Sequence, residues 1–158
     1  TINFIKEDAT KLSFPSNVYD GVIFGFNGLM QIPHRENRKK AMNECFRVLR
    51  PGGRFVFTSH DRGIPRWKKF WVNERKKWRI GLQDKALIEF GDRYGETPTG
   101  RLFIHVPDRS DIQKDLRDTG FLLERDVMRS KVSDESKLVK DFSDECRFWV
   151  ARKPESSG

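Results

Sequence analysis

The feature that most constrains the fold is a strand–helix–strand pattern that occupies residues 21–59. Residues 21–26 are a continuous apolar run of strand length, which is typical of a strand covered on both faces. From residue 35 to residue 49 the apolar side chains fall on one helical face, and charged side chains fill the other. Pro51-Gly52-Gly53 ends this helix, and residues 54–59 form the next apolar run. Such a unit predicts a parallel sheet.

Shorter patterns predict further elements on either side of this unit. Residues 2–5 are a β-rich run, which we expect to form a short strand. Residues 102–106 have the pattern of a short strand or an extended lead-in to a helix. Asp108 or Ser110 can cap that helix, and Gly120 ends it.

Two more strands are predicted near the end of the chain, over residues 121–128 and 146–151. The polar connection between them contains no helical segment long enough for a crossover, so we expect the two strands to be antiparallel neighbours. The sequence therefore predicts an α/β fold with a mostly parallel sheet and an antiparallel last strand.

The composition limits the class of protein. A length of 158 residues fits one domain with a real core, and 36% hydrophobic with 34% charged residues indicates a soluble, globular chain. No apolar run approaches the ~18 residues that a membrane span needs. Cys45 and Cys146 lie on separate predicted elements and form no Cys/His pattern. We therefore expect no disulfide, no metal site and a reducing, cytoplasmic setting.

The positive charge is concentrated in one segment. The chain carries a net charge of +8, and the stretch from Arg62 to Arg79 holds eight basic residues and one acid, a net charge of +7. The rest of the chain is close to neutral. Any preference for polyanions therefore depends on this one segment.

Four short strings resemble one family, in the family's order along the chain. Residues 7–15 (Glu-Asp-Ala, then Phe-Pro) resemble the turn after its third strand, and residues 19–23 (Tyr-Asp-Gly-Val-Ile) resemble its fourth strand. Residues 47–53 (Arg-Val-Leu-Arg-Pro-Gly-Gly) are similar to its helix-turn string, and residues 118–121 (Asp-Thr-Gly-Phe) to the entry into its sixth strand. The family is that of the Rossmann-like class I S-adenosylmethionine-dependent methyltransferases, and the resemblance covers roughly residues 2–152.

The resemblance implies a sheet that lacks its first two strands. The family's strand order is 3-2-1-4-5-7-6, and the glycine-rich loop after its first strand has no counterpart here. We expect the strand at residues 2–5 to be unpaired and the edge at Val22-Ile23-Phe24 to be open. Such a fragment should not fold alone as a monomer in the family's geometry, and it should be inactive alone. Either upstream residues complete the sheet or the sheet rearranges.

These patterns divide the chain into three parts. Residues 1–152 are a partial methyltransferase domain, and residues 63–100 are an inserted lid or substrate segment within it. The polar residues 153–158 are expected to be a disordered tail.

The function that the resemblance implies is methyl transfer from S-adenosylmethionine to an acceptor that the sequence does not identify, with small-molecule oxygen or nitrogen nucleophiles preferred. The matching positions make Asp8 and Ala9 candidate contacts to the cofactor's adenine, and Gly25, Phe26 and Asn27 candidate contacts to its methionine part. The alternatives are that Asp8 only caps a local turn and that Gly25 belongs to an ordinary turn at the end of a strand.

The candidate general base is His60, which with Asp61 follows a predicted strand at the carboxyl end of the sheet, where ligands bind in open α/β folds. His34 and His105 are weaker candidates, and a lone histidine is often only a surface residue. The candidate substrate-binding residues are His60, Trp67, Trp71 and His105.

The inserted segment allows three interpretations. Trp67, Phe70, Trp71 and Trp78 fall on one helical face, with most basic residues elsewhere. The helix could be a lid whose aromatic side chains close the substrate pocket. It could instead bind RNA or another polyanion, or lie against an anionic membrane surface or an acidic protein.

Two alternative functions follow from the basic segment: an RNA methyltransferase, and a non-catalytic, methyltransferase-like module that binds a polyanion between Arg62 and Arg79. A nicotinamide dehydrogenase is a further enzyme alternative, and the predicted antiparallel end of the sheet argues against it.

Overall fold

The computed structural model describes residues 2–155, except for the side chains of residues 141 and 142. Its main sheet contains four strands in the order β1-β2-β6-β5, and a second sheet is the hairpin β3–β4. The strands are β1 (Tyr19–Phe24), β2 (Leu49–Ser59), β3 (Asp92–Thr97), β4 (Gly100–His105), β5 (Leu122–Met128) and β6 (Arg147–Arg152). The helices are α1 (Arg35–Val48), α2 (Lys68–Arg79), α3 (Arg109–Thr119) and α4 (Lys137–Phe142), with three 3₁₀ turns, η1 (Gly28–Gln31), η2 (Pro65–Trp67) and η3 (Arg129–Lys131).

The main sheet has the predicted topology. Strand β1 pairs with β2 in parallel, and β6 pairs antiparallel with β2 on one side and with β5 on the other. This arrangement corresponds to strands 4-5-7-6 of the implied order, and it confirms both the mostly parallel α/β fold and the antiparallel last strand. The sheet is not rearranged.

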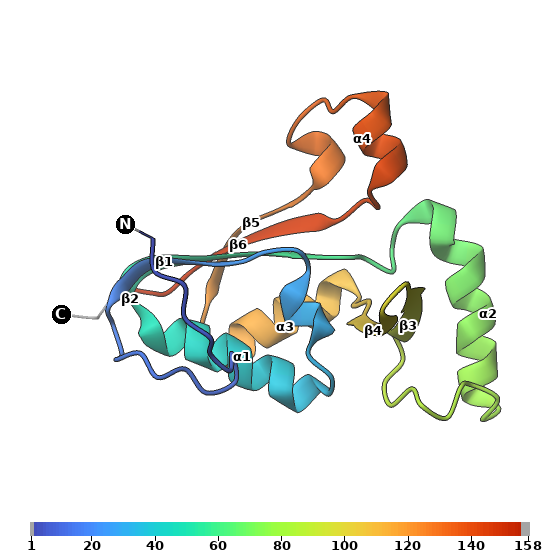
Figure 1. Cartoon of the computed structure of the whole chain (residues 1–158), viewed down its shortest axis with the longest axis horizontal. Coiled ribbons are helices and arrows are strands. Elements are labelled where there is room, and N and C mark those ends of the chain that lie inside the picture. The colour runs from blue at the N-terminus through green and yellow to red at the C-terminus, as the bar shows by residue number, and fades with distance from the viewer. Residues whose placement is uncertain (1, 156–158) are drawn as a thin grey trace.

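The core lies on the face of the sheet that α1 and α3 cover, which Figure 1 shows below the strands. Apolar side chains of α1 meet Ile112 and Leu116 of α3, which lie four residues apart on one helical face. Stacked aromatic rings continue this layer across the sheet, with Phe55 next to Phe57 and Phe57 next to Trp149. Asp108 caps α3 in a capping box and Gly120 ends it in the left-handed conformation, as predicted.

The turn between α1 and β2 lies close to the predicted one. The helix ends at Val48, and β2 begins at Leu49 instead of at residue 54. Residues 50–53 bulge between the pairs Tyr19–Leu49 and Gly21–Arg54. A Cβ atom at Gly53 would lie 2.9 Å from the carbonyl oxygen of Arg50, so only glycine fits there.

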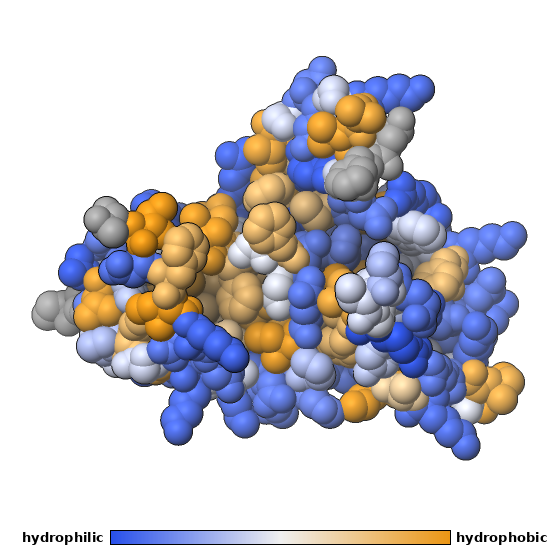
Figure 2. Space-filling view, in the orientation of Figure 1, coloured by the Kyte–Doolittle hydropathy of each residue, from blue (hydrophilic) through white to orange (hydrophobic). Residues whose placement is uncertain are grey.

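The predicted strand at residues 2–5 is wrong. This segment has no regular structure, and its apolar side chains are exposed, with Phe4 94% exposed. A strand requires a neighbour for its backbone N–H and C=O groups, and no described strand lies beside it. The outer edge of β1 is also uncovered, and Ile23 there is 80% exposed. Figure 2 shows hydrophobic side chains gathered on this side of the molecule.

The inserted segment forms a helix and a hairpin. Helix α2 stands at one end of the molecule, beside β3 and β4 (Figure 1). Trp71 and Trp78 both pack edge-on against Phe90, with ring centroids 5.8 and 6.1 Å apart, so these two rings of the predicted aromatic face point inward. Trp67 lies on η2 and is 43% exposed. The sequence does not predict strand β3, because its residues are mostly polar and include Gly95. The hairpin also extends the inserted unit past Gly100 to His105.

The two ends of the last strand are anchored to other elements. Lys153, which the sequence analysis assigned to a disordered tail, donates hydrogen bonds of 2.8 Å to the carbonyl oxygens of Phe46 and Leu49, close to the end of α1. Residues 156–158 of that tail lie outside the described residues. The polar connection before β6 contains only η3 and the short helix α4, and none of the described helices is long and apolar enough to cross a membrane.

At the other end of β6, Arg147 holds two buried carboxylates together. Its guanidinium lies 2.8 Å from Asp61 and 2.7 Å from Asp126, which are 7% and 5% exposed. Burial alone would raise the pKa of Asp126, but the bonds from Arg109 and Arg147 outweigh burial, and its pKa lies below the usual value. The stabilisation from this carboxylate is therefore present above the pKa of an unfolded aspartate and is lost as pH falls through the lower folded value.

We predict that Arg147→Met lowers the free energy of unfolding by about 3–5 kcal/mol at neutral pH, because two buried carboxylates would lose the cation between them. The loss of stability should shrink as pH falls towards about 4, because protonation of Asp126 removes the charge that Arg147 no longer balances. Urea denaturation at neutral pH and at about pH 4 measures the free energy of unfolding of both proteins.

The control is Arg109→Met, since Arg109 also binds Asp126 but is 54% exposed. Arg109→Met should lower the free energy of unfolding by no more than about 1 kcal/mol. Equal losses in the two variants, or a loss in Arg147→Met that does not change with pH, would contradict the prediction.

Candidate functional site

The candidate site begins where β1 and β2 end side by side. Because these strands are parallel, their carboxyl ends meet at one edge of the sheet. The backbone turns sharply after β1, with φ of 55° at both Phe26 and Asn27, a left-handed conformation that costs non-glycine residues free energy. The N–H of Asn27 donates to the hydroxyl of Thr58, 2.9 Å away, and so fixes this turn against β2.

His60 lies directly after β2 and bridges two segments. Its Nδ1 is 3.3 Å from the backbone carbonyl oxygen of Glu145, and its Nε2 is 3.3 Å from the side-chain amide nitrogen, Nδ2, of Asn27. A carbonyl oxygen can only accept, so the neutral ring carries its proton on Nδ1 and presents a lone pair at Nε2. Both distances are long for hydrogen bonds, so another donor can displace Asn27 from Nε2.

The turn after β1 has room and an unused acceptor. No atom lies within 4 Å of the position that a Cβ atom would take at Gly25. The Oδ1 atom of Asn27 is buried and has no hydrogen-bond partner among the described residues. A buried acceptor without a donor is costly, and a bound molecule with an N–H or O–H group would satisfy it.

A cavity of about 460 Å³, here called the aromatic cavity, lies next to His60. Its volume suits a small molecule. Trp67, Phe70 and Trp71 of the inserted segment supply three aromatic walls, and Ile64 and Val106 supply aliphatic ones. Three of the four predicted substrate-binding residues, His60, Trp67 and Trp71, therefore line one cavity.

The charged residues in this cavity are already paired. Asp61 binds Arg147, and Arg93 lies 3.0 Å from Glu74. Asp144, from the segment that precedes β6, pairs with Arg66. Among the described lining residues, this leaves His60 as the titratable side chain without an ion pair. No sequence pattern indicates Arg93 or Asp144, because the hairpin and the chain before β6 bring them to the cavity.

Asp8 and Ala9 lie before β1, outside the aromatic cavity. The Oδ1 atom of Asp8 accepts from the N–H and the hydroxyl of Thr10, each 2.8 Å away, which holds the pKa of this exposed carboxyl below its usual value. Its Oδ2 atom makes no hydrogen bond to another described residue. The local turn that we considered for Asp8 is therefore present, and one oxygen stays available to a ligand.

The other two histidines lie elsewhere. His34 precedes α1, is exposed and makes no side-chain capping bond. His105, the fourth predicted substrate-binding residue, is buried at the end of β4 and lines a different cavity. Its partner Asp92 faces it across the hairpin. This contact could not be predicted from the sequence, because it depends on strand β3.

The basic segment is partly neutralised. Arg62, Arg66 and Lys77 each pair with a carboxylate. Five of its eight basic residues make no ion pair to a described residue. The described residues contain no group of three or more His, Cys, Asp or Glu side chains that could hold a metal ion.

Comparison with known proteins gives matches in the first third of the chain. Residues 1–57 match the family described as "Methyltransferase domain". The chain is similar to the ubiquinone/menaquinone biosynthesis C-methyltransferase UbiE of Ectopseudomonas mendocina, with 42% identity over 55 residues, or 35% of this chain and 20% of that protein. The UbiE protein of Bartonella bacilliformis is 40% identical over 55 residues, with the same coverage. The chain thus spans about a fifth of the length of these relatives.

Solved structures share the fold over nearly the whole chain. A methyltransferase of Methanosarcina mazei has a TM-score of 0.69 at 18% identity, covering 95% of this chain and 66% of that one. The 1,6-didemethyltoxoflavin-N1-methyltransferase of Burkholderia thailandensis, with its substrate and S-adenosylhomocysteine bound, has a TM-score of 0.56 at 14% identity, covering 93% of this chain and 48% of that one. Residues 1–57 are thus similar to a methyltransferase family, and the chain as a whole shares the fold of solved S-adenosylmethionine-dependent methyltransferases.

Proposed function

We propose that this chain supports methyl transfer from S-adenosylmethionine to a small-molecule oxygen or nitrogen nucleophile in the aromatic cavity. One observation carries the proposal: His60 touches Asn27 on the side of the expected cofactor contacts and lines the aromatic cavity on the other. The side chain that can take a proton therefore stands between the two places where the reactants would lie.

The residues after β1 fit the cofactor. The open space at Gly25 allows close approach to the backbone, and the unpartnered Oδ1 atom of Asn27 can accept from an ammonium or hydroxyl group. Gly25, Phe26 and Asn27 would hold its methionine part, and Asp8 and Ala9 its adenine. When bound, the cofactor supplies a methyl group on a sulfonium, which is its own leaving group.

His60 would act on the acceptor. Its Nε2 lone pair can take the proton from an acceptor O–H or N–H, and its Nδ1–H stays bound to the carbonyl of Glu145. The aromatic walls would orient the acceptor and exclude water. Asp61 would keep the end of β2 in place through Arg147.

The walls favour a planar, mainly apolar acceptor. Trp67, Phe70 and Trp71 offer ring surfaces, and the charged side chains of the cavity are already paired. UbiE is named for C-methylation in quinone biosynthesis, and the Burkholderia enzyme methylates a ring nitrogen. The match at residues 1–57 ends before the cavity, so it gives little guidance about the acceptor.

The alternatives through the basic segment have less support. Three of its cations are bound to carboxylates, and Trp71 and Trp78 are turned inward against Phe90, which leaves less for phosphates and bases to contact. An RNA methyltransferase or a polyanion-binding module stays an outcome of the tests below. A cytoplasmic location is part of the proposal, and the two free cysteines agree with a reducing setting.

We predict that Gly25→Leu weakens S-adenosylhomocysteine binding at least roughly tenfold, because the new side chain would occupy the cofactor's space. Isothermal titration calorimetry measures this affinity on the present chain. Where the gene encodes residues before Thr1, the same titration is made on the extended protein. The matched control is Gly95→Leu, since Gly95 also has no atom within 4 Å of its Cβ position but lines the aromatic cavity.

Gly95→Leu should leave S-adenosylhomocysteine binding unchanged. Equal affinity in Gly25→Leu and the unmodified chain would place the cofactor elsewhere. Folded proteins that bind heparin or RNA but never S-adenosylhomocysteine would favour the non-catalytic polyanion module.

We predict that His60→Gln lowers the rate of methyl transfer by roughly 10²- to 10⁴-fold, because glutamine cannot take the acceptor's proton. Radiolabelled S-adenosylmethionine and a panel of phenols and nitrogen heterocycles provide the assay. Affinity for S-adenosylhomocysteine should not change in His60→Gln, because the substitution leaves the turn after β1 in place. An unchanged rate in His60→Gln would remove His60 as the base.

A further inference from the structure

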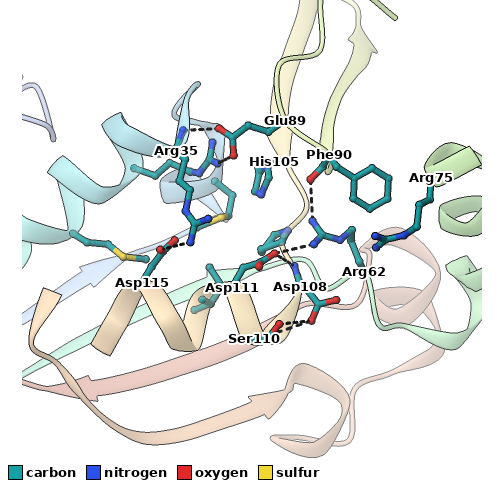
Figure 3. Close-up of a pocket in the computed structure, with 15 residues that line it drawn as sticks. Arg35, Arg62, Arg75, Glu89, Phe90, His105, Asp108, Ser110, Asp111 and Asp115 are labelled. Carbon is teal, nitrogen blue, oxygen red and sulfur yellow. Dashed lines mark hydrogen bonds and ion pairs between the residues drawn. The ribbon is translucent and has the colours of Figure 1, made fainter. Parts of the chain in front are cut away.

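A second cavity, here called the polar cavity, has no part in the proposed methyl transfer. Its volume is about 400 Å³, and it lies between α1, the start of α3, the loop after β2 and the chain that enters β3. Arginine and acidic side chains from these elements converge on it (Figure 3). Polar and charged residues supply most of its lining, which favours an occupant recognised by charge and hydrogen bonds.

Three of its four arginines are already bound to carboxylates. Arg35 lies 2.6 Å from Asp115, Arg38 lies 2.8 Å from Glu89, and Arg62 lies 2.8 Å from Asp111. These pairs leave the inner walls nearly neutral.

The fourth arginine is available to a ligand. Arg75 of α2 has no carboxylate partner among the described residues, and its guanidinium rests on the ring of Phe90, 4.5 Å from the centroid. A small neighbouring lobe of about 150 Å³ adds Lys68, which likewise makes no ion pair to a described residue. The carboxylate of Asp108 is used by the cap of α3. The mouth of the polar cavity is therefore cationic.

A buried Asp–His pair forms part of the same cavity wall. Nδ1 of His105 lies 2.8 Å from Asp92, and the side chains of His105 and Asp92 are 8% and 2% exposed. The other oxygen of Asp92 accepts from the backbone N–H groups of Ile88 and Glu89. Burial alone would raise the pKa of Asp92, but these bonds outweigh burial and hold its pKa below the usual value.

An ionised Asp92 determines which nitrogen of His105 is free. Nδ1 must carry a proton to donate to the carboxylate, so Nε2 is the atom available to the cavity. Nε2 makes no hydrogen bond to a described residue. A second proton, on Nε2, would place an imidazolium between Asp92 and whatever occupies the cavity.

We propose that the polar cavity binds a small oxyanion, a carboxylate or phosphoryl group, with Arg75 and Lys68 at its mouth and the protonated Nε2 of His105 inside. An oxyanion cannot accept from the neutral imidazole, whose Nε2 carries a lone pair, so binding takes up one proton. Asp92 stabilises the resulting imidazolium.

The charges around His105 come from every element packed against it. They are Asp92 on β3, Glu89 and the ring of Phe90 before β3, Arg35 and Arg38 on α1, Arg62 after β2, Arg75 on α2, and Asp108, Asp111 and Asp115 on α3. Glu89, Asp111 and Asp115 are bound to arginines, whereas Asp92 and Asp108 are held by backbone N–H groups, His105 or the Ser110 hydroxyl, so the positive charge that an entering oxyanion meets lies on Arg75 and Lys68 at the mouth.

Sulfate and acetate at constant ionic strength test the proposal on the whole chain by calorimetry, since neither probe changes charge between about pH 6 and about pH 8, where imidazole titrates. We expect at least one of them to bind roughly tenfold more tightly at the lower pH, with uptake of one proton. Preference for sulfate would indicate a phosphoryl ligand, and preference for acetate a carboxylate. The imidazole ¹⁵N signals of His105 should move on binding.

The variant is Arg75→Gln, and the matched control is Arg79→Gln, one turn further along α2 and outside the cavity. Arg75→Gln should weaken binding roughly tenfold, and Arg79→Gln should have no effect. Equal effects of the two substitutions, affinity that does not change with pH, or unmoved His105 signals would overturn the proposal. Both variants keep His60 and the turn after β1, so a failure here leaves the proposed methyl transfer untouched.

Discussion

The pairing of β2 on both of its edges is the constraint on which the rest of the structure depends. On one edge β2 pairs in parallel with β1, which forces the chain through α1 and brings the carboxyl ends of both strands together. On the other edge it pairs antiparallel with β6, so the chain before β6 reaches the same end of the sheet. His60 therefore meets Asn27 from one side and Glu145 from the other.

Strong periodicity made this part of the fold predictable. The apolar runs before and after α1, the Pro-Gly-Gly turn and the capping residues of α3 each specify local structure, and they agree on one topology. His60, Trp67 and Trp71 could be assigned to a substrate site from their positions after β2. Their convergence on one cavity could not, because it depends on how α2 packs against Phe90 and the hairpin.

Two features of the fold were not predicted correctly from the sequence, and each has a physical cause. Residues 2–5 have strand-like composition, but a strand exists only with a partner, and no described strand lies beside them. Strand β3 was hidden for the opposite reason: its sequence is polar and contains Gly95, so little in its composition indicates a strand, yet β4 pairs with it throughout. Missing that register also hid the contact between Asp92 and His105, which lie thirteen residues apart.

Consecutive residues separate the two cavities. Asp61 lines the aromatic cavity and Arg62 the polar one, and Val106 and His105 divide between the two cavities in the same way. The guanidinium of Arg62 donates a hydrogen bond of 2.7 Å to the carbonyl oxygen of Val106 and so connects these two segments. Helix α2 also serves both cavities, with Trp71 on one and Arg75 on the other. The two cavities thus share α2 as a wall but have no described lining residue in common.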